Sequence, residues 1–214
     1  MDVVDVQFSL TGNVIPVDHG YALFSAVSKI VSGLHGAKDV GILHIRGTLV
    51  GDRMQLLTPQ SSLTIRLPAD RVNHVIPLAG KVLVLGHYRI RVGVCRCKAL
   101  VPSPSLYSRL VVIKGFMEPA PFFGAVQRQL KDLGIRGVPS LILRPDTADS
   151  NGGRAERRRS PFVRRTLRIH DKEVVGFALR VEGMEPKESV ILQEKGIGGR
   201  RRFGCGIFVP FGQR

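Results

Sequence analysis

The stretch KGIGGRRRFGCGIF, residues 195–208, is the most informative part of the sequence, because five glycines surround three consecutive arginines. It follows a segment with helical periodicity, EPKESVILQEKG (185–196), and leads into the β-rich GCGIFVPF (204–211). Glycine is needed where the backbone takes a positive φ or approaches a ligand closely, and successive N–H groups suit phosphate oxygens. The stretch therefore predicts an anion-binding loop formed by Gly196, Gly198, Gly199, Arg200, Arg201, Arg202, Gly204 and Gly206. The alternative is a turn with a purely structural role.

Outward from this loop, both halves of the 214-residue chain show the same order of elements. In the second half, strands are expected in RLVVIKGF (109–116), TLRIH (166–170), EVVGFALRVEG (173–183) and the segment 204–211. Helices are expected there in APFFGAVQRQLKDLG (120–134) and the segment 185–196. In the first half, strands are expected in VVDVQFSL (3–10), VGILHIRGTLV (40–50), DRMQLLTP (52–59) and KVLVLGHYRIRVGV (81–94). Helices are expected there in YALFSAVSKIVSGL (21–34) and PADRVNHVIPLA (68–79). The pattern predicts an α+β protein of two tandem ferredoxin-like β-α-β-β-α-β domains.

The boundary between the two domains is predicted in VPSPSLYS, residues 101–108, where proline and serine cluster between strand patterns. This gives an N-terminal domain of residues 1–103 and a C-terminal domain of residues 104–214. The halves share no residue-level repeat, so the duplication rests on element order alone.

The charge of the chain indicates a polyanionic partner. Lysine and arginine number 32 against 17 acidic residues, a formal charge of +15, and such a field attracts nucleic acid first and membrane surfaces second. No stretch approaches the roughly 18–20 apolar residues that span a bilayer, and the acidic start MDVVD is no signal peptide, so we expect a cytoplasmic protein. The glycine-rich loop lacks a Gly-Lys-Ser/Thr ending, which disfavours nucleotide triphosphate hydrolysis. Three cysteines without a CxxC pair indicate neither a disulfide framework nor a zinc site.

A polar insert, DTADSNGGRAERRRSP (146–161), interrupts the second half and predicts a basic loop. Between residues 154 and 168 there are seven arginines and one glutamate, which predicts contacts with RNA phosphates. The candidates are Arg157, Arg158, Arg159, Arg164 and Arg165. The alternative is a loop that only aids solubility.

Several motifs carry a resemblance to a known family. Gly-Ile-Gly, five residues and Gly-Cys-Gly (196–206) look like the C-terminal glycine-rich loop of the RAMP superfamily of CRISPR systems. Further similar motifs are IPVDHGYALFSAVS, GLHG, HIRG, IRLPADRV, PLAGK, SRLVVIKG, LRIHDKEVVGF and GGRRRFGCGIFVPF. Together they resemble the sixth CRISPR-associated protein family in its myxobacterial-type variant, over nearly the whole chain. The resemblance implies two ferredoxin-like folds and an enzyme that binds the repeat of precursor CRISPR RNA and cuts it once per repeat, releasing guide RNAs.

The same resemblance implies cleavage without a metal ion or other cofactor. The 2′-OH beside the scissile phosphate would be the nucleophile, leaving a 2′,3′-cyclic phosphate or 3′-phosphate and a 5′-OH. Histidine suits the proton transfer, since its ordinary pKa is about 6.5. Lysine, arginine or backbone N–H groups suit the stabilisation of charge on the phosphoryl oxygens.

His35, in GLHGAKD, is the first candidate for the catalytic histidine, because it occupies the region where the family commonly carries it. His44, in LHIRG, is the second, with a histidine on a sheet face as its alternative. Tyr21 and Lys38 are the nearest matches to the tyrosine and lysine that some relatives use, although neither spacing is close and Tyr21 also fits a core aromatic. Arg46 is a candidate for charge stabilisation. The remaining histidines are interpreted as structural: His19, His74, His87 and His170.

Two other functions compete with repeat-RNA cleavage: a non-catalytic RAMP subunit that only binds guide RNA, and a generic basic RNA-binding protein. Fold does not choose among them, because function resides in the site. The sequence leaves open whether the protein forms a homodimer or joins other CRISPR effector subunits.

Overall fold

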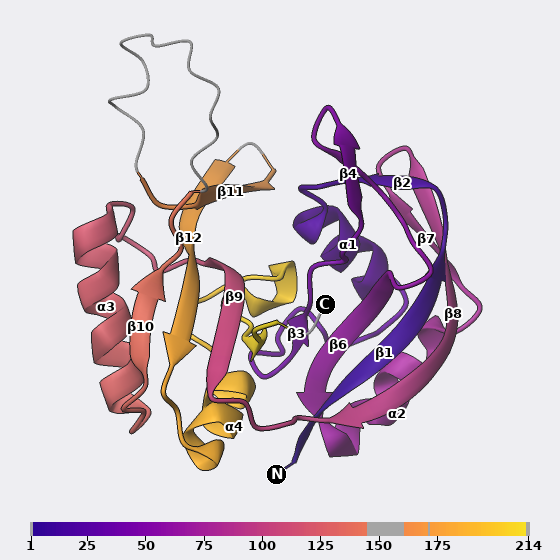
Figure 1. The fold of residues 1–214 in the computed structure, drawn as a ribbon. Coiled ribbons are helices and arrows are strands. Elements are labelled where there is room, and N and C mark those ends of the chain that lie inside the picture. The colour runs from indigo at the N-terminus through magenta and orange to yellow at the C-terminus, as the bar shows by residue number, and fades with distance from the viewer. Residues whose placement is uncertain (1, 145–160, 171, 213–214) are drawn as a thin grey trace, which may run out of the picture.

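The structure, a computed structural model, describes residues 2–144, 161–170 and 172–212. Figure 1 shows two lobes side by side, each built on its own β-sheet, with the C-terminal segment in yellow between the sheets. The chain crosses from the first sheet to the second between Ala99 and Ser105, and the predicted boundary lies in this connection.

The first lobe has a five-stranded antiparallel sheet in the order β3-β6-β1-β8-β7. Its strands are β1 (Val3–Thr11), β3 (Gly41–Ile42), β6 (Ser62–Pro68), β7 (Val82–Leu85) and β8 (Tyr88–Ala99). Its helices are α1 (Gly20–Ser28), η1 (Ala69–Arg71), α2 (Val72–Val75) and η2 (Ile76–Leu78). Counted along β1, α1, β3, β6, α2 and β8, the order is β-α-β-β-α-β with the first and third strands side by side, as in a ferredoxin-like unit.

Two assignments in this lobe are wrong. Segment 40–50 supplies the second strand of the main sheet only as the two-residue β3, and segment 52–59 does not supply the third strand. Their other strands, β4 (Thr48–Gly51) and β5 (Met54–Leu56), form a separate three-stranded sheet with β2 (Val14–Pro16). The third strand of the main sheet is β6, whose Leu63, Ile65 and Leu67 alternate toward the core. Helix α1 also ends at Ser28, well before the end of the predicted segment 21–34.

The second lobe repeats the ferredoxin-like order around the long strand β12 (Lys172–Glu182). Its other strands are β9 (Ser105–Val111), β10 (Val138–Leu141), β11 (Arg164–Ile169) and β13 (Val209–Pro210), and its helices are α3 (Pro119–Asp132), α4 (Pro186–Lys195) and η4 (Arg201–Phe203). The sheet order is β10-β12-β9-β13, and β11 pairs with the first half of β12. The last strand is shorter than predicted, because residues 204–208 belong to the glycine-rich loop.

Each lobe has its own hydrophobic core, and a small third cluster lies in the second lobe; Phe203 packs against both this cluster and the core of the first lobe. The third cluster contains Leu110, Val112, Leu167 and Cys205, with Phe203 packed against it. Gly20, the first residue of α1, faces this cluster so closely that a Cβ there would lie 2.4 Å from the carbonyl oxygen of Phe203. The glycine-rich loop therefore lies directly against α1.

Candidate functional site

A row of aromatic rings runs between α1 and the glycine-rich loop. The ring of Phe203 lies 5.8 Å from that of Tyr21 and 5.0 Å from that of Phe24, both on α1. A histidine stands at each end of the row. His170 Nε2 is 2.9 Å from the hydroxyl oxygen of Tyr21, and the His35 ring lies 5.1 Å from Phe24, edge to face. Residues from α1, the segment after α1, the β11–β12 turn and η4 thus form one cluster, which we call the aromatic row.

Arg202, in the glycine-rich loop, holds the segment that carries His35. Its Nη1 donates to the carbonyl oxygen of Leu34 at 3.0 Å, and its guanidinium carbon lies 5.3 Å from the centre of the Phe24 ring. His35 itself is exposed to solvent. Lys38 is exposed too, and among the described residues no hydrogen bond joins it to His35 or to another member of the row. The structure therefore brings His35 and Tyr21 to one row but does not tie Lys38 to it.

His170 is the member of the row that the sequence did not identify. It was interpreted as structural, yet it is hydrogen-bonded to Tyr21 across 149 residues of sequence. It occupies the β11–β12 turn with a φ of 51°, a left-handed conformation that is uncommon for a residue with a side chain. Only the pairing of the two lobes brings this histidine to α1, so no local sequence signal could have indicated it.

His44, the second catalytic candidate, lies outside the row and stacks on His19, with ring centres 4.2 Å apart. His19 is fully buried; its Nδ1 donates to the carbonyl oxygen of Pro16 at 2.8 Å, and its Nε2 accepts from the backbone N–H of Ile45 at 3.1 Å. Burial lowers the pKa of His19 to about 4. Burial, followed by the neighbouring His19 and nearby arginines, also holds the pKa of His44 well below its usual value. Both rings are therefore neutral near pH 7, so His44 does not act there as a cationic acid.

The five glycines of the glycine-rich loop do not offer free N–H groups, and the prediction of a bare N–H cradle for phosphate is wrong. Each N–H already donates to an acceptor in the protein: Gly196 to Leu192 O, Gly198 to Gln129 Oε1, Gly199 to Val112 O, Gly204 to Arg201 O and Gly206 to Leu110 O. The glycines instead allow backbone segments to touch. A Cβ on Gly196 would lie 2.1 Å from Gly206 O, and a Cβ on Gly198 would lie 2.3 Å from Val112 O.

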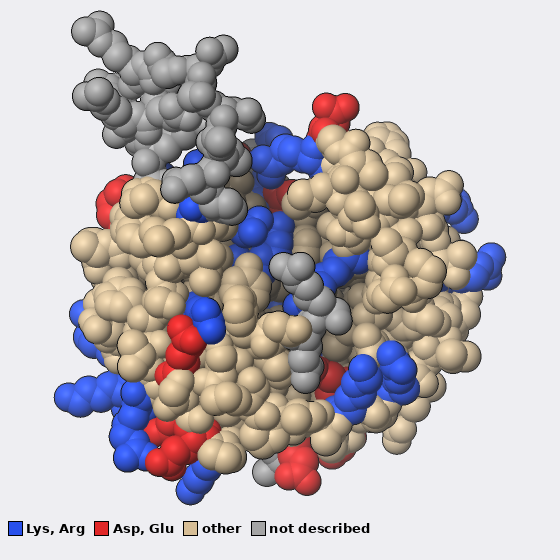
Figure 2. Space-filling view, in the orientation of Figure 1, with Lys and Arg blue, Asp and Glu red and all other residues tan. Residues whose placement is uncertain are grey.

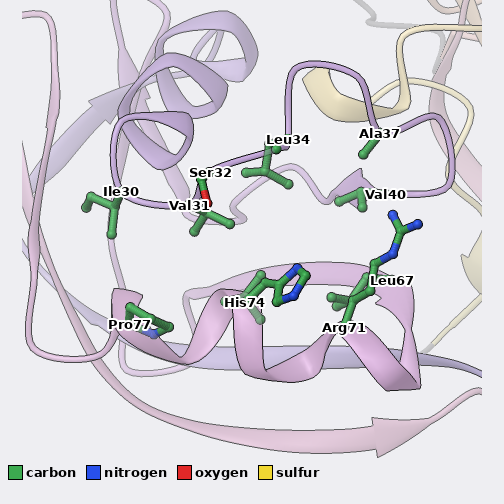
Figure 3. Close-up of a pocket in the computed structure, with 12 residues that line it drawn as sticks. Ile30, Val31, Ser32, Leu34, Ala37, Val40, Leu67, Arg71, His74 and Pro77 are labelled. Atoms are coloured by element: carbon green, nitrogen blue, oxygen red, sulfur yellow. The ribbon is translucent and has the colours of Figure 1, made fainter.

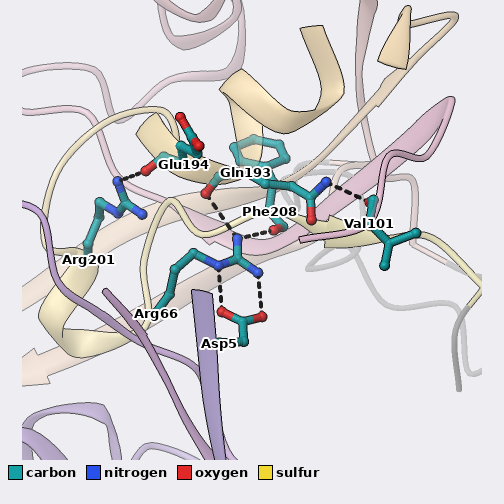
Figure 4. Close-up of polar contacts among 7 residues, drawn as sticks. All are labelled: Asp5, Arg66, Val101, Gln193, Glu194, Arg201 and Phe208. Carbon is teal, nitrogen blue, oxygen red and sulfur yellow. Dashed lines mark hydrogen bonds and ion pairs between the residues drawn. The ribbon is translucent and has the colours of Figure 1, made fainter. Parts of the chain in front are cut away.

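The three arginines of the loop have different surroundings. Arg201 donates from Nη1 to the carbonyl oxygen of Glu194 (Figure 4). The same Nη1 donates to the carbonyl oxygen of Lys195 at 2.7 Å, so Arg201 satisfies the C-terminal end of α4. Arg202 holds the carbonyl of Leu34, as described above. Arg200 is exposed, with a φ of 64°. Of the three, Arg200 is the one that points its charge to solvent.

Positive side chains gather in the hollow between the lobes, as Figure 2 shows. Arg46 is exposed and lines, with His44, a cavity of about 810 Å³ that runs over the polar face of β1 and β6. On β11, Arg164 is exposed and Arg165 is partly buried. The predicted candidates Arg157, Arg158 and Arg159, with most of the basic insert, lie outside the described residues.

A second cavity, of about 580 Å³, lies under the segment that carries His35 (Figure 3). Its walls are mostly apolar and come from residues 30–40 on one side and from α2 with its neighbours on the other. Its polar side chains are Ser32, His74 and Arg71, the last ion-paired with Asp39 at 3.0 Å. His35 itself does not line this cavity.

Within residues 2–144, 161–170 and 172–212, no cluster of three or more histidine, cysteine, aspartate or glutamate side chains is arranged to hold a metal ion. No helix of the described part of the chain is long and apolar enough to cross a membrane.

Comparison with known proteins identifies the family. The family model described as Cas6 Crispr matches residues 4–213. The chain belongs to the Cas6 family. A curated relative, the "CRISPR-associated endonuclease Cas6" of Myxococcus xanthus (strain DK1622), is 36% identical over 213 residues, which cover 100% of this chain and 84% of the relative. The resemblance that the sequence motifs indicated is therefore confirmed.

Solved structures of Cas6 proteins share the fold at low sequence identity. A "CRISPR associated protein Cas6" aligns with a TM-score of 0.64 and 11% identity over 98% of this chain and 99% of the other. A Cas6-related protein from Pyrococcus furiosus aligns with a TM-score of 0.65 and 13% identity over 99% of this chain and 100% of the other. The predicted α+β fold of two tandem ferredoxin-like units is confirmed, while the roles of individual side chains stay predictions.

Proposed function

We propose that this Cas6 family member is an endoribonuclease that binds the repeat of precursor CRISPR RNA and cuts it once per repeat without a metal ion. The observation that carries the proposal is the aromatic row, which has an imidazole at each end and a tyrosine hydroxyl fixed by a hydrogen bond. The relative from Myxococcus xanthus, whose name is that of an endonuclease, supports the same function. The high positive charge of the chain suits an RNA ligand.

In the proposed reaction, the 2′-OH attacks the adjacent phosphorus and the 5′ oxygen leaves. A proton is therefore removed from the 2′-OH and a proton is supplied to the leaving 5′ oxygen. His35 is exposed beside the row and is the residue that we assign to proton transfer. Tyr21 would donate a hydrogen bond to a phosphoryl oxygen. When Nε2 of His170 carries a proton, it donates to the Tyr21 oxygen and leaves the phenol hydrogen free for this task. We assign His170 as a positioning residue that acts through Tyr21.

Charge on the phosphoryl oxygens would be stabilised by arginines beside the row. Arg202 is held between Leu34 and Phe24, next to His35, and the exposed Arg200 precedes it by two residues. Lys38 is also exposed in the segment that carries His35 and would add charge from the other side. A cation close to the reacting phosphate lowers the barrier by stabilising the negative charge that develops on the phosphoryl oxygens.

The test is cleavage of labelled repeat RNA in excess EDTA, followed by mapping of the product ends. We expect a 5′-OH and a 2′,3′-cyclic phosphate or 3′-phosphate, and no product from RNA with a 2′-deoxy nucleotide at the cut. His35→Ala should lower the single-turnover rate by about 10²- to 10⁴-fold. His87→Ala, which removes an exposed histidine at the β7–β8 turn, is the matched control and should cut normally.

The variant His170→Ala separates a positioning role from a structural one. Loss of rate together with a changed pH profile, while thermal stability stays constant, would support positioning of Tyr21. Strict dependence on magnesium, or full activity of the His35→Ala protein, would refute the proposed mechanism. Tight binding of repeat RNA by the wild-type protein with no product would instead indicate a non-catalytic binding subunit.

A further inference from the structure

Three arginines converge where the two lobes meet. Arg109 comes from β9 and Arg165 from β11, strands that flank β12, while Arg46 comes from the connection between β3 and β4. The three are close enough for the charge of each to act on the ring of His44. Strands β9 and β12 approach each other closely here: a Cβ on Gly176 of β12 would lie 2.1 Å from the carbonyl oxygen of Val111 of β9.

Two of these arginines are poorly compensated. Burial, followed by repulsion from Arg165, lowers the pKa of Arg109 to about 10. The Nε of Arg165 is buried and has no hydrogen-bond acceptor among the described residues. No ion pair within the described part of the chain includes either residue. Asp18 is a carboxylate that acts favourably on Arg109, but its Oδ2 already accepts the backbone N–H of Arg168 at 3.0 Å.

Partial burial of two neighbouring cations without an anion is unfavourable, since the lost hydration is not offset by attraction to a partner. A protein that keeps such a pair at the junction of its lobes gains when an anion binds there. Arginine is also the residue best suited to phosphate, because its planar fork of N–H donors matches two oxygens at once. The missing anion is therefore expected to be a phosphate group.

The histidine pair beneath these arginines fits the same ligand. His44 is stacked on the buried His19 and lines one end of the cavity of about 810 Å³ between the lobes. A neutral imidazole adds a hydrogen-bond donor without adding repulsion to the two guanidinium groups. The cavity is also lined by residues of β1 and β6, so an extended polyanion lying in it would reach His44.

We propose that Arg109, Arg165 and His44 hold one phosphodiester of the bound RNA, at an anchoring site whose side chains are not those of the aromatic row proposed to cut the RNA. The inference rests on the proposed function in that its ligand is the RNA of that reaction. It reassigns His44 from catalysis to binding, and it adds Arg109, which the sequence did not indicate.

The test measures binding rather than cutting, so that it remains valid if the protein does not cleave. A repeat RNA with a 2′-deoxy nucleotide at the cut is titrated by fluorescence anisotropy with full-length protein, at several potassium chloride concentrations. Arg109→Gln and Arg165→Gln should each raise Kd at least about tenfold and make the plot of log Kd against log salt shallower by about 0.7. Arg89→Gln removes an exposed arginine of β8 and is the matched control for charge alone.

Binding by both variants that is indistinguishable from that of Arg89→Gln would overturn the site and leave only a general electrostatic field. Thermal melts in sodium sulfate give an independent readout, because an anion that binds the folded protein raises its Tm. Sulfate should raise the Tm of the wild-type protein more than that of Arg109→Gln, and equal rises would count against the site. If Arg109→Gln does not fold, Arg165→Gln alone carries the binding test. The wild-type protein could bind the RNA without cutting it while Arg109→Gln and Arg165→Gln weaken binding as expected. That result would refute the proposed function and still support the anchoring site.

Discussion

Replacing Arg66 by methionine should destabilise the protein more than any change at a surface ion pair. Arg66 lies on β6 with only 1% of its side chain exposed. Its Nε and Nη2 each donate to a carboxylate oxygen of Asp5 at 2.8 Å, and its Nη1 donates to the carbonyl oxygens of Gln193 at 3.0 Å and Phe208 at 2.7 Å (Figure 4). The one side chain thus joins the first sheet to the end of α4 and to the segment before β13.

The magnitude follows from these contacts. Removing one partner of a buried ion pair typically costs about 3–5 kcal/mol, because the other charge is left without compensation. In Arg66→Met the carboxylate of Asp5 and two carbonyl oxygens all lose their donor. For a chain of this size each kcal/mol lowers Tm by about 2–4 °C, so the expected fall is roughly 6–20 °C.

Calorimetry and urea unfolding of the two variants Arg66→Met and Arg71→Met would measure the difference. Arg71 forms an ion pair with Asp39 in which both side chains are more than 40% exposed (42% and 45%), so its removal should cost less than about 1 kcal/mol. A loss below about 1 kcal/mol for Arg66→Met, or equal losses for both variants, would refute the reasoning. Asp5→Leu combined with Arg66→Met should recover part of the stability, since no unpaired charge then remains buried.

Three further predictions concern the loop contact, acid stability and the thiols. Gly20→Ala should lower the free energy of unfolding by about 1–3 kcal/mol, because the new Cβ clashes with the backbone of η4, although helix propensity alone predicts a gain of about 1 kcal/mol. In the control Gly36→Ala the new Cβ meets no atom within 4 Å, so urea titration should show an unchanged free energy of unfolding. The pKa of His19 is about 4 in the folded chain and about 6.5 in the unfolded chain. Neutral His19 therefore makes its full contribution to the free energy of unfolding above pH 6.5, and roughly 3 kcal/mol of that free energy should be lost as the pH drops to about 4. Equal urea midpoints at pH 7 and pH 4.5 would contradict this. Burial raises the pKa of the Cys205 thiol to about 12, so iodoacetamide at pH 8 should modify the exposed Cys97 and spare Cys205 in the folded protein, as mass spectrometry of the digested protein would reveal.

The sequence predicted the helices of the second lobe well, but it missed a strand in each lobe, β10 (Val138–Leu141) in the second and β6 in the first. Helices α3 and α4 carry clear signals, with proline in the first turn of each and a capping box between Glu185 and Glu188 at the start of α4. In the first lobe, β6 has the alternation of a strand, but it directly follows a strong hairpin pattern and contains a buried arginine, Arg66, which is atypical of a core strand. The strand was therefore missed, and the hairpin that precedes it was assigned to the wrong sheet.

The candidate site was predictable only where its residues carry a local pattern. His35 and Tyr21 were indicated by the resemblance of their surroundings to the family, and they share the row. His170 and Arg109 carry no local signal, because what distinguishes them is a contact made across the junction of the lobes: a hydrogen bond to Tyr21 for the first, and burial beside Arg165 for the second. Such contacts depend on how two separately folded sheets dock, which periodicity along one segment does not encode.

The glycine-rich loop explains how docking and chemistry are connected in this chain. The N–H groups of its glycines donate within the protein, and Gly196 lets the loop lie against its own backbone. Gly20, the first residue of α1, lets the loop lie against that helix. That contact sets Phe203 between the two aromatic rings of α1 and lets Arg202 reach the carbonyl of Leu34. A substitution that lifts the loop would therefore withdraw Phe203 from the rings of Tyr21 and Phe24, and Arg202 from the carbonyl of Leu34. Gly20→Ala should consequently lose cutting before it loses binding, because the arginines at β9 and β11 stay on their own sheet while these contacts to the aromatic row are lost.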